Sequence, residues 1–168
     1  MNGKTHIVIA EAVLTGLTVS AATISFRGIT VHPGIGILSA SFGAVLADID
    51  MSRSSYGLKF PIFSKIFTHR GFTHTGVVGV ALTTLLFATS GAKQSICTSI
   101  AQSLLFGFVV AYISHIIADS FNGKGVPLFW PICTKKIHIM KITTGGVSEP
   151  IFMVVFIAMV LIHLMTLF

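Results

Sequence analysis

The sequence predicts an all-α integral membrane protein, a bundle of about five transmembrane helices with two long cytoplasmic loops. Three observations predict this fold class. Of the 168 residues, 53% are hydrophobic and only 10% are charged, whereas a soluble domain carries about 25% charged residues. The mean hydropathy is +0.90. The apolar residues fall into five segments that polar connections separate, and we expect residues 1–168 to form a single membrane-embedded helical domain.

The five apolar segments supply the predicted helices, because a span needs roughly 20 predominantly apolar residues. The second and third segments are short for a span, so four spans with a re-entrant piece remain an alternative. The second segment is rich in Gly and Ser, which let helix backbones approach closely in lipid. The segments are Ile7–Phe26, Val31–Ala47, Gly76–Ser90, Ile96–Ala118 and Ile151–Phe168.

The two long connections, residues 48–75 and 119–150, carry most of the basic residues. All 11 Lys and Arg residues except Arg27 and Lys93 lie in these connections or near the N-terminus. The positive-inside rule therefore places the N-terminus and both connections in the cytoplasm and the C-terminus outside. Within the first connection, Lys59–Phe67 alternates Lys with Phe and Ile and is predicted to lie in the interface as a short amphipathic helix.

The net charge of +6 bears on the expected partners. In a soluble protein this charge would suggest nucleic acid. In so apolar a chain it indicates orientation in the membrane and attraction to anionic lipid head groups. We therefore expect membrane lipids as partners and no nucleic acid.

Residues that can bind a metal gather at one predicted membrane boundary. The chain has five acidic residues and seven histidines, and eight of these groups lie at the predicted cytoplasmic end of a helix. Ionisable groups in an apolar bundle are costly and usually functional, and a divalent cation relieves the repulsion among carboxylates. We predict a divalent-metal site at this boundary. The candidate ligands are His6, Asp48, Asp50, His69, His74, His115, Asp119 and Glu149.

The spacing of these residues suits metal coordination. His115 and Asp119 are four residues apart and share a helix face. Asp48 and Asp50 would point to nearly opposite sides of a continuous helix, so we expect the helix to unwind between them. Each pair alone could also serve a structural role, as a helix cap or in a structural hydrogen bond. The gathering of all eight residues at one membrane boundary is what favours a metal site. Thr73 is the expected N-cap of the third helix.

Imidazole and carboxylate ligands together suit zinc, manganese or iron, of which zinc is expected. Eight candidates exceed the about four ligands of one zinc ion, so we expect either two ions or one ion with supporting residues. Asp50 is also a candidate general base. Arg70 is a candidate catalytic residue that binds phosphate oxygens, with a membrane-anchoring role as its alternative. Glu11 lies roughly 140° from His6 around a helix and is left outside the site.

Several sequence blocks match one known family. The blocks are Asp48-Ile-Asp50, His69-Arg-Gly-Phe-Thr-His74, and His115-Ile-Ile-Ala-Asp119 followed by Gly125-Val-Pro-Leu-Phe-Trp130-Pro131. They resemble the YdjM-like family, and Thr5-His6 and Thr144-Gly145 with Glu149 are similar to its opening and late motifs. Members of that family are described as metal-dependent hydrolases of the bacterial inner membrane, by similarity to zinc-dependent phospholipases. The resemblance implies a multi-pass inner membrane protein with these residues at its metal site.

Together these features predict a membrane-bound, metal-dependent hydrolase, phospholipase- or phosphatase-like, that uses a metal-activated water. A metal centre at the depth of the head groups faces the ester and phosphate bonds of lipids, so a lipid or phosphate ester is the expected substrate. Two alternatives remain. The first is a non-catalytic scaffold whose metal holds the helices together. The second is a metal-ion transporter, although transport normally uses polar groups near the bilayer midplane.

Overall fold

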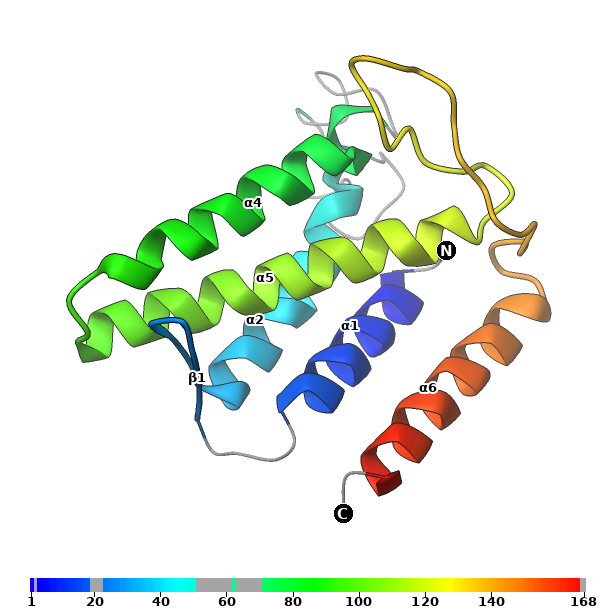
Figure 1. Ribbon diagram of the computed structural model, residues 1–168. Helices are drawn as coiled ribbons and strands as arrows, with labels where there is room; N and C mark the ends of the chain where they lie inside the picture. The colour runs from blue at the N-terminus through cyan, green and yellow to red at the C-terminus, as the bar shows by residue number, and fades with distance from the viewer. Residues whose placement is uncertain (2, 19–22, 51–61, 63–70, 167–168) are drawn as a thin grey trace.

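The computed structural model describes residues 1, 3–18, 23–50, 62 and 71–166. In this part of the chain the architecture is mostly helical, as predicted (Figure 1). Helix α5 runs through the centre of the molecule and packs against α2, α1 and α4. The α-helices are α1 (Gly3–Thr18), α2 (Pro33–Leu46), α4 (Gly76–Ala88), α5 (Ile96–Ser120) and α6 (Ser148–Thr166).

Small side chains allow α1, α2 and α5 to pack closely around the centre of the bundle. Their shared core consists of Leu14, Val110 and four alanines, which are fully buried: Ala10, Ala40, Ala44 and Ala111. At the tightest crossing, a Cβ added to Gly107 of α5 would collide with the backbone carbonyl of Gly36 in α2. The small residues of the second apolar segment therefore act as predicted at this position, since only glycine permits so close an approach.

The first predicted helix was too long. Helix α1 ends at Thr18, and the stretch up to Val31 contains an antiparallel hairpin of β1 (Ile24–Phe26) and β2 (Ile29–Val31). Arg27 and Gly28 join the strands with φ angles of 48° and 78°, the left-handed conformations that a tight hairpin turn requires. Both strands alternate β-branched or aromatic residues with Ser or Thr, a pattern that favours a strand over a helix.

The other predicted segments agree more closely with the structure. The third corresponds to α4 with the following 3₁₀ turn η3 (Thr89–Gly91), the fourth to α5, and the fifth to α6. Two stretches of the described chain are long and apolar enough to cross a membrane, Pro33–Asp50 and Ile96–Ser120. Shorter apolar helices cover Gly76–Gly91 and Ser148–Ile162.

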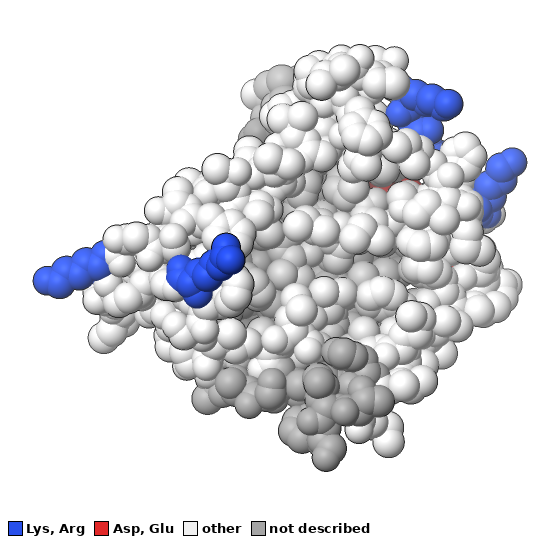
Figure 2. Space-filling view, viewed as in Figure 1, with Lys and Arg blue, Asp and Glu red and all other residues white. Residues whose placement is uncertain are grey.

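Charged side chains are unevenly distributed over the surface. On the face shown in Figure 2, Lys and Arg stand at two ends of the molecule and a wide uncharged surface lies between them. Large apolar side chains are exposed on several helices, among them Leu38 of α2, Val80 of α4, Ile117 of α5 and Val154 of α6. Such a surface is costly in water and is what a bilayer would cover.

Candidate metal centre

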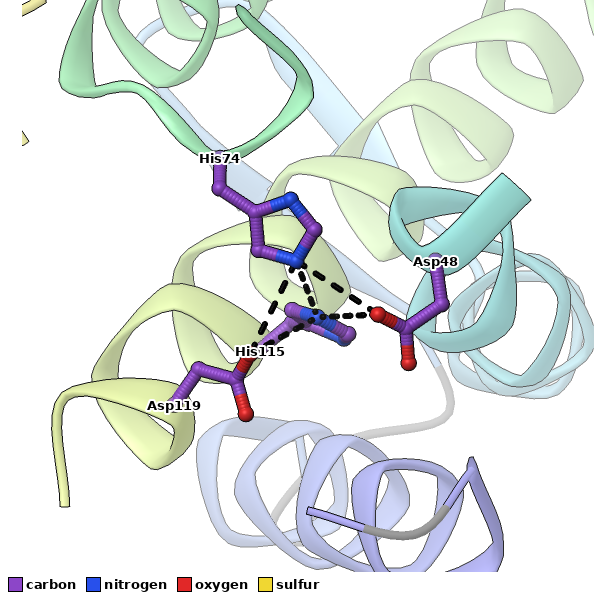
Figure 3. A group of neighbouring side chains, drawn as sticks. All are labelled: Asp48, His74, His115 and Asp119. Carbon is purple, nitrogen blue, oxygen red and sulfur yellow. Dashed lines mark hydrogen bonds and ion pairs between the residues drawn. The ribbon is translucent and has the colours of Figure 1, made fainter. Parts of the chain in front are cut away.

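Three separate parts of the chain place four potential metal ligands around one point (Figure 3). Asp48 comes from the 3₁₀ turn η1 (Ala47–Asp50) that follows α2, and His74 comes from the 3₁₀ turn η2 (Phe72–His74) that precedes α4. His115 and Asp119 lie one turn apart near the end of α5. One ligand atom from each of the four lies within 4.8 Å of the others, and all four residues are buried.

The end of α2 is built to direct carboxylates inward. The α-helix ends at Leu46, and Asp48 departs from helical geometry with φ −89° and ψ 16°. Because the backbone tightens and kinks here, Asp48 and Asp50 are both buried, although two positions of a regular helix would point nearly opposite ways. The expected departure from a regular helix is present at Asp48, but it does not turn both carboxylates to one centre.

The distances among the four side chains suit a small divalent ion. The Nε2 atoms of His74 and His115 are 3.2 Å apart. Asp48 Oδ1 lies 3.5 Å from His74 Nε2 and 3.7 Å from His115 Nε2, and Asp119 Oδ2 lies 3.7 Å and 3.9 Å from the same atoms. Ligand bonds of about 2.0–2.1 Å in a tetrahedral site separate neighbouring ligand atoms by about 3.3 Å. The four atoms therefore need only small shifts to enclose an ion.

Partners outside the group orient both imidazoles. His115 Nδ1 lies 2.8 Å from the carbonyl oxygen of Ala44, to which it donates, so its Nε2 carries the lone pair that faces the group. His74 Nδ1 lies 3.0 Å from Thr73 Oγ1 and 3.6 Å from Asp50 Oδ2. The Thr73 hydroxyl also donates to Asp50, so this pair of residues contacts the Nδ1 side of His74, away from the group of four. The two nitrogen ligands are thus held in the direction that a metal needs.

This arrangement differs from two expectations. The residue before α4 is Thr75, so the prediction that Thr73 is the N-cap was wrong; Thr73 binds Asp50 instead. The structure brings Asp50 to the back of His74 rather than into the group of four, because the kinked turn directs the two carboxylates to different sides of that imidazole.

The carboxylates also change the chemistry of His74. Burial alone would lower the pKa of its imidazole, but hydrogen bonds and the negative charges of Asp48 and Asp50 outweigh that effect and raise the pKa to about 9. In the metal-free chain at neutral pH, a proton on His74 therefore balances the neighbouring carboxylates. A metal ion that binds there must displace this proton.

His6 lies beside the group of four. Its ring stacks on that of His115 with centroids 3.8 Å apart, and its Nε2 is 3.4 Å from Asp119 Oδ1. The Met1 amino group donates to the same oxygen at 2.8 Å. Both ring nitrogens of His6 are buried, and neither has a hydrogen-bond partner among the described residues. The Nε2 of His6 therefore faces Asp119, whereas its buried Nδ1 forms no hydrogen bond with the described residues, which is costly for a buried polar atom.

The remaining predicted ligands do not join the group in the described structure. Glu149 accepts hydrogen bonds from Thr5 Oγ1 at 2.9 Å and from the backbone N–H of Gly145 at 2.7 Å, which ties the start of α6 to α1. His69 and Arg70 lie outside the described residues, as does most of the predicted interfacial stretch 59–67. Glu11, which was left out of the site, accepts a hydrogen bond from Ser41 inside the bundle.

Sequence reasoning missed Tyr112. Its hydroxyl donates to the carbonyl oxygens of Thr73 and Thr75 at 3.0 Å and 2.9 Å, which fixes the turn that carries His74 to α5. One signal was present in the sequence. Tyr112 precedes His115 by three residues, so the two side chains share one face of the predicted helix.

Comparison with known proteins gives two kinds of match. A family model described as YdjM inner membrane protein matches residues 1–168. Among individual relatives, the uncharacterized protein YvsG of Bacillus subtilis (strain 168) is 29% identical over 153 residues, which cover 89% of this chain and 85% of YvsG. Inner membrane protein YdjM of Escherichia coli (strain K12) is 39% identical over 97 residues.

The match to Escherichia coli YdjM covers 55% of this chain and 47% of that protein, so the similarity extends over about half of each. Inner membrane protein YdjM of Shigella flexneri matches to the same extent. No solved structure matches the chain.

Proposed function

The chain belongs to the YdjM inner membrane protein family, and from this premise we propose that it is a membrane-embedded, metal-dependent hydrolase of a lipid or phosphate ester. The observation that carries the proposal is the buried group of Asp48, His74, His115 and Asp119. Two imidazoles and two carboxylates form a donor set that suits zinc, manganese or iron. Zinc is our first choice, because it binds imidazole and carboxylate ligands and can expand to five ligands, which would leave a position for water beside these four.

The proposed arrangement in the membrane is a single domain, residues 1–168, with about five spans. The N-terminus and the metal centre face the cytoplasm, and the C-terminus lies outside. Two described stretches long enough to span, and the uncharged surface between two charged ends, support this arrangement. The positive-inside rule supports the orientation, because Lys124, Lys135, Lys136 and Lys141 all follow the end of α5 that carries His115 and Asp119.

In the proposed reaction, a bound metal would polarise the substrate and lower the pKa of a water molecule. The residues of the chain have separate tasks. Asp48, His74, His115 and Asp119 hold the ion, while Ala44 and Asp50 hold the two imidazoles in the correct direction. Asp50 therefore serves better as a positioning residue than as the general base. His6 has two ring nitrogens without hydrogen-bond partners beside Asp119, which makes it the better candidate to move a proton.

Burial of all four ligands favours a second candidate, a metal that holds the helices together without catalysis. One experiment separates the two functions. The purified chain in lipid nanodiscs would be loaded with Zn²⁺ or Mn²⁺ and incubated with an inner-membrane lipid extract, with a chelator-treated sample as control. A hydrolase releases lipid products only when metal is present, and His115→Ala abolishes the release. If chelation lowers the melting temperature but no product forms with any lipid, the metal is structural.

A further inference from the structure

An apolar groove runs along one side of the bundle between α1, α5 and α6. It encloses about 620 Å³, within the range of sites that hold small ligands. Its floor is formed by Ile9 and Val13 of α1 and by Ala118 of α5, and its far wall by Phe152 and Phe156 of α6. Helix α6 packs against α1, and Figure 1 shows its ribbon set apart from that of α5.

One end of the groove lies about one helical turn from the candidate metal centre. On α1, His6 begins the helical stripe that continues through the groove residues Ile9 and Val13. On α5, the groove residue Ala118 directly precedes Asp119. His6 itself does not line the groove; its buried imidazole lies beyond Ile9, with Nε2 3.4 Å from Asp119 Oδ1.

A second apolar groove, of about 520 Å³, lies between α5 and α4 and shares the α5 residues Ile113 and Ile117 with the first. Its Tyr112 hydroxyl is hydrogen-bonded to two backbone carbonyl oxygens. The groove along α6 leads instead toward His6, whose Nε2 lies 3.4 Å from Asp119 Oδ1 and whose buried Nδ1 has no hydrogen-bond partner among the described residues.

We propose that the groove between α1, α5 and α6 binds one acyl chain of a membrane phospholipid and directs the ester linkage of that lipid toward His6 and the metal centre. The proposal rests on the proposed hydrolase function and names its substrate class. The occupant follows from the surroundings: the chain belongs to an inner membrane family, and the groove is lined by aliphatic and aromatic side chains that pack favourably with a hydrocarbon chain. Imidazole can bind the oxygen atoms of an ester or phosphate at the polar end.

Photo-crosslinking tests the groove without requiring turnover. The full chain is reconstituted in vesicles of phosphatidylethanolamine and phosphatidylglycerol that contain phosphatidylglycerol with a diazirine on one acyl chain. After irradiation, mass spectrometry locates the labelled residues. We expect labels to concentrate on Val13, Ala118 and Phe156 and to be displaced by excess unlabelled phosphatidylglycerol. Labelling that is equal at Val13 and at Val80, in the groove against α4, would show ordinary surrounding lipid and overturn the proposal.

Turnover of paired substrates then tests the link to the metal centre. Val13→Trp fills the proposed groove, and Val80→Trp is the matched control in the groove against α4. Val13→Trp should reduce cleavage of long-chain phosphatidylglycerol by about tenfold or more, the scale on which a hydrophobic pocket responds to a poor fit. It should leave cleavage of a short-chain, water-soluble analogue and the metal content unchanged. If both variants affect both substrates equally, the groove does not position the substrate.

Failure of this inference and failure of the hydrolase proposal give different results. Concentrated labelling of the groove without turnover of any lipid would leave a lipid-binding site and reject the hydrolase. Metal-dependent turnover with uniform labelling would support the hydrolase and reject the groove.

Discussion

Two buried polar clusters lie toward opposite ends of α5, and they are built on different principles. Near the start of the helix, Gln102 and Ser103 bind the backbone of the hairpin. Gln102 accepts a hydrogen bond from the Thr30 N–H at 2.8 Å and donates to the carbonyl oxygens of Gly28 and Thr89 at 3.2 Å and 3.0 Å. Ser103 accepts from the His32 N–H at 2.9 Å and donates to Ser99. These groups are neutral, and each uses both its donor and its acceptor.

Near the end of the same helix, His115 and Asp119 face Asp48 and His74. These groups are ionisable, the carboxylates approach each other across two imidazoles, and His6 beside them has ring nitrogens without hydrogen-bond partners in the described chain. Buried polar groups that only stabilise a fold are normally satisfied within the protein. The difference indicates that the first cluster stabilises the hairpin, whereas the composition of the second suits a metal ion.

The largest expected effect is the loss of bound metal when a ligand in the second cluster is replaced, compared with a replacement in the first cluster. Asp119→Ala removes one of four ligands, so the purified variant should contain no bound metal after a wash that leaves wild-type metal in place. Gln102→Ala, at the other end of α5, should retain the wild-type content. Elemental analysis measures both variants. Equal metal content in Asp119→Ala and wild type would place the metal elsewhere.

Asp50→Asn tests the support behind His74. The asparagine keeps the size of the side chain but removes the charge that faces His74 Nδ1. Loss of such an outer partner typically weakens metal binding by about 10–100-fold. Titration against a chelating dye gives the affinity, and Glu11→Gln, outside the site, is the control. An unchanged affinity would mean that Asp50 does not orient the ligand.

Gln102→Leu, in the first cluster, should lower the stability of the protein without changing its metal affinity. The leucine leaves the Thr30 N–H without its hydrogen-bond partner, and an unsatisfied buried donor costs about 1–3 kcal/mol. We therefore expect a lower melting temperature in detergent and an unchanged metal affinity. Loss of metal from Gln102→Leu would show that the two clusters are coupled and would contradict the separation of roles.

The pH dependence of metal affinity tests the same site through the proton on His74. The pKa of His74 is raised to about 9, so its proton is present at neutral pH in the metal-free chain and competes with the metal. Affinity should rise by about tenfold per pH unit toward pH 9 and then level off. Without metal the sign reverses: the stability from the charged His74 is complete below about pH 6.5 and declines as pH rises through the folded pKa. Equal metal affinities at pH 7 and pH 9 would contradict this account.

Much of the helical architecture was predictable because long apolar segments have clear boundaries. Helices α4, α5 and α6 begin within three residues of the predicted starts, at Gly76, Ile96 and Ser148. The hairpin was missed, since a short apolar run with β-branched residues does not by itself distinguish a strand from the end of a helix. The residues of β1 were predicted as the end of the first segment, 27–30 as a short connection and Val31 as the start of the second segment, whereas the structure joins these pieces in one hairpin.

The candidate site was predictable as a region but not as a set of ligands. Metal-binding residue types at the helix ends indicated the correct end of the bundle. Membership of the group depends on side-chain direction, which sequence spacing does not give. Asp48 and Asp50 separate only because of the kink in η1, and Glu149 is bound by Thr5. The binding of Gln102 and Ser103 to the hairpin backbone could not be predicted, because two neutral polar residues in an apolar helix have no distinctive pattern.

X-ray absorption spectroscopy on the zinc-loaded chain tests the central claim most directly. The account predicts a zinc ion with nitrogen and oxygen ligands at about 2.0–2.2 Å and scattering from two imidazoles, which His115→Ala eliminates. Sulfur ligands, or an absence of imidazole scattering in the wild-type chain, would contradict a metal centre formed by Asp48, His74, His115 and Asp119.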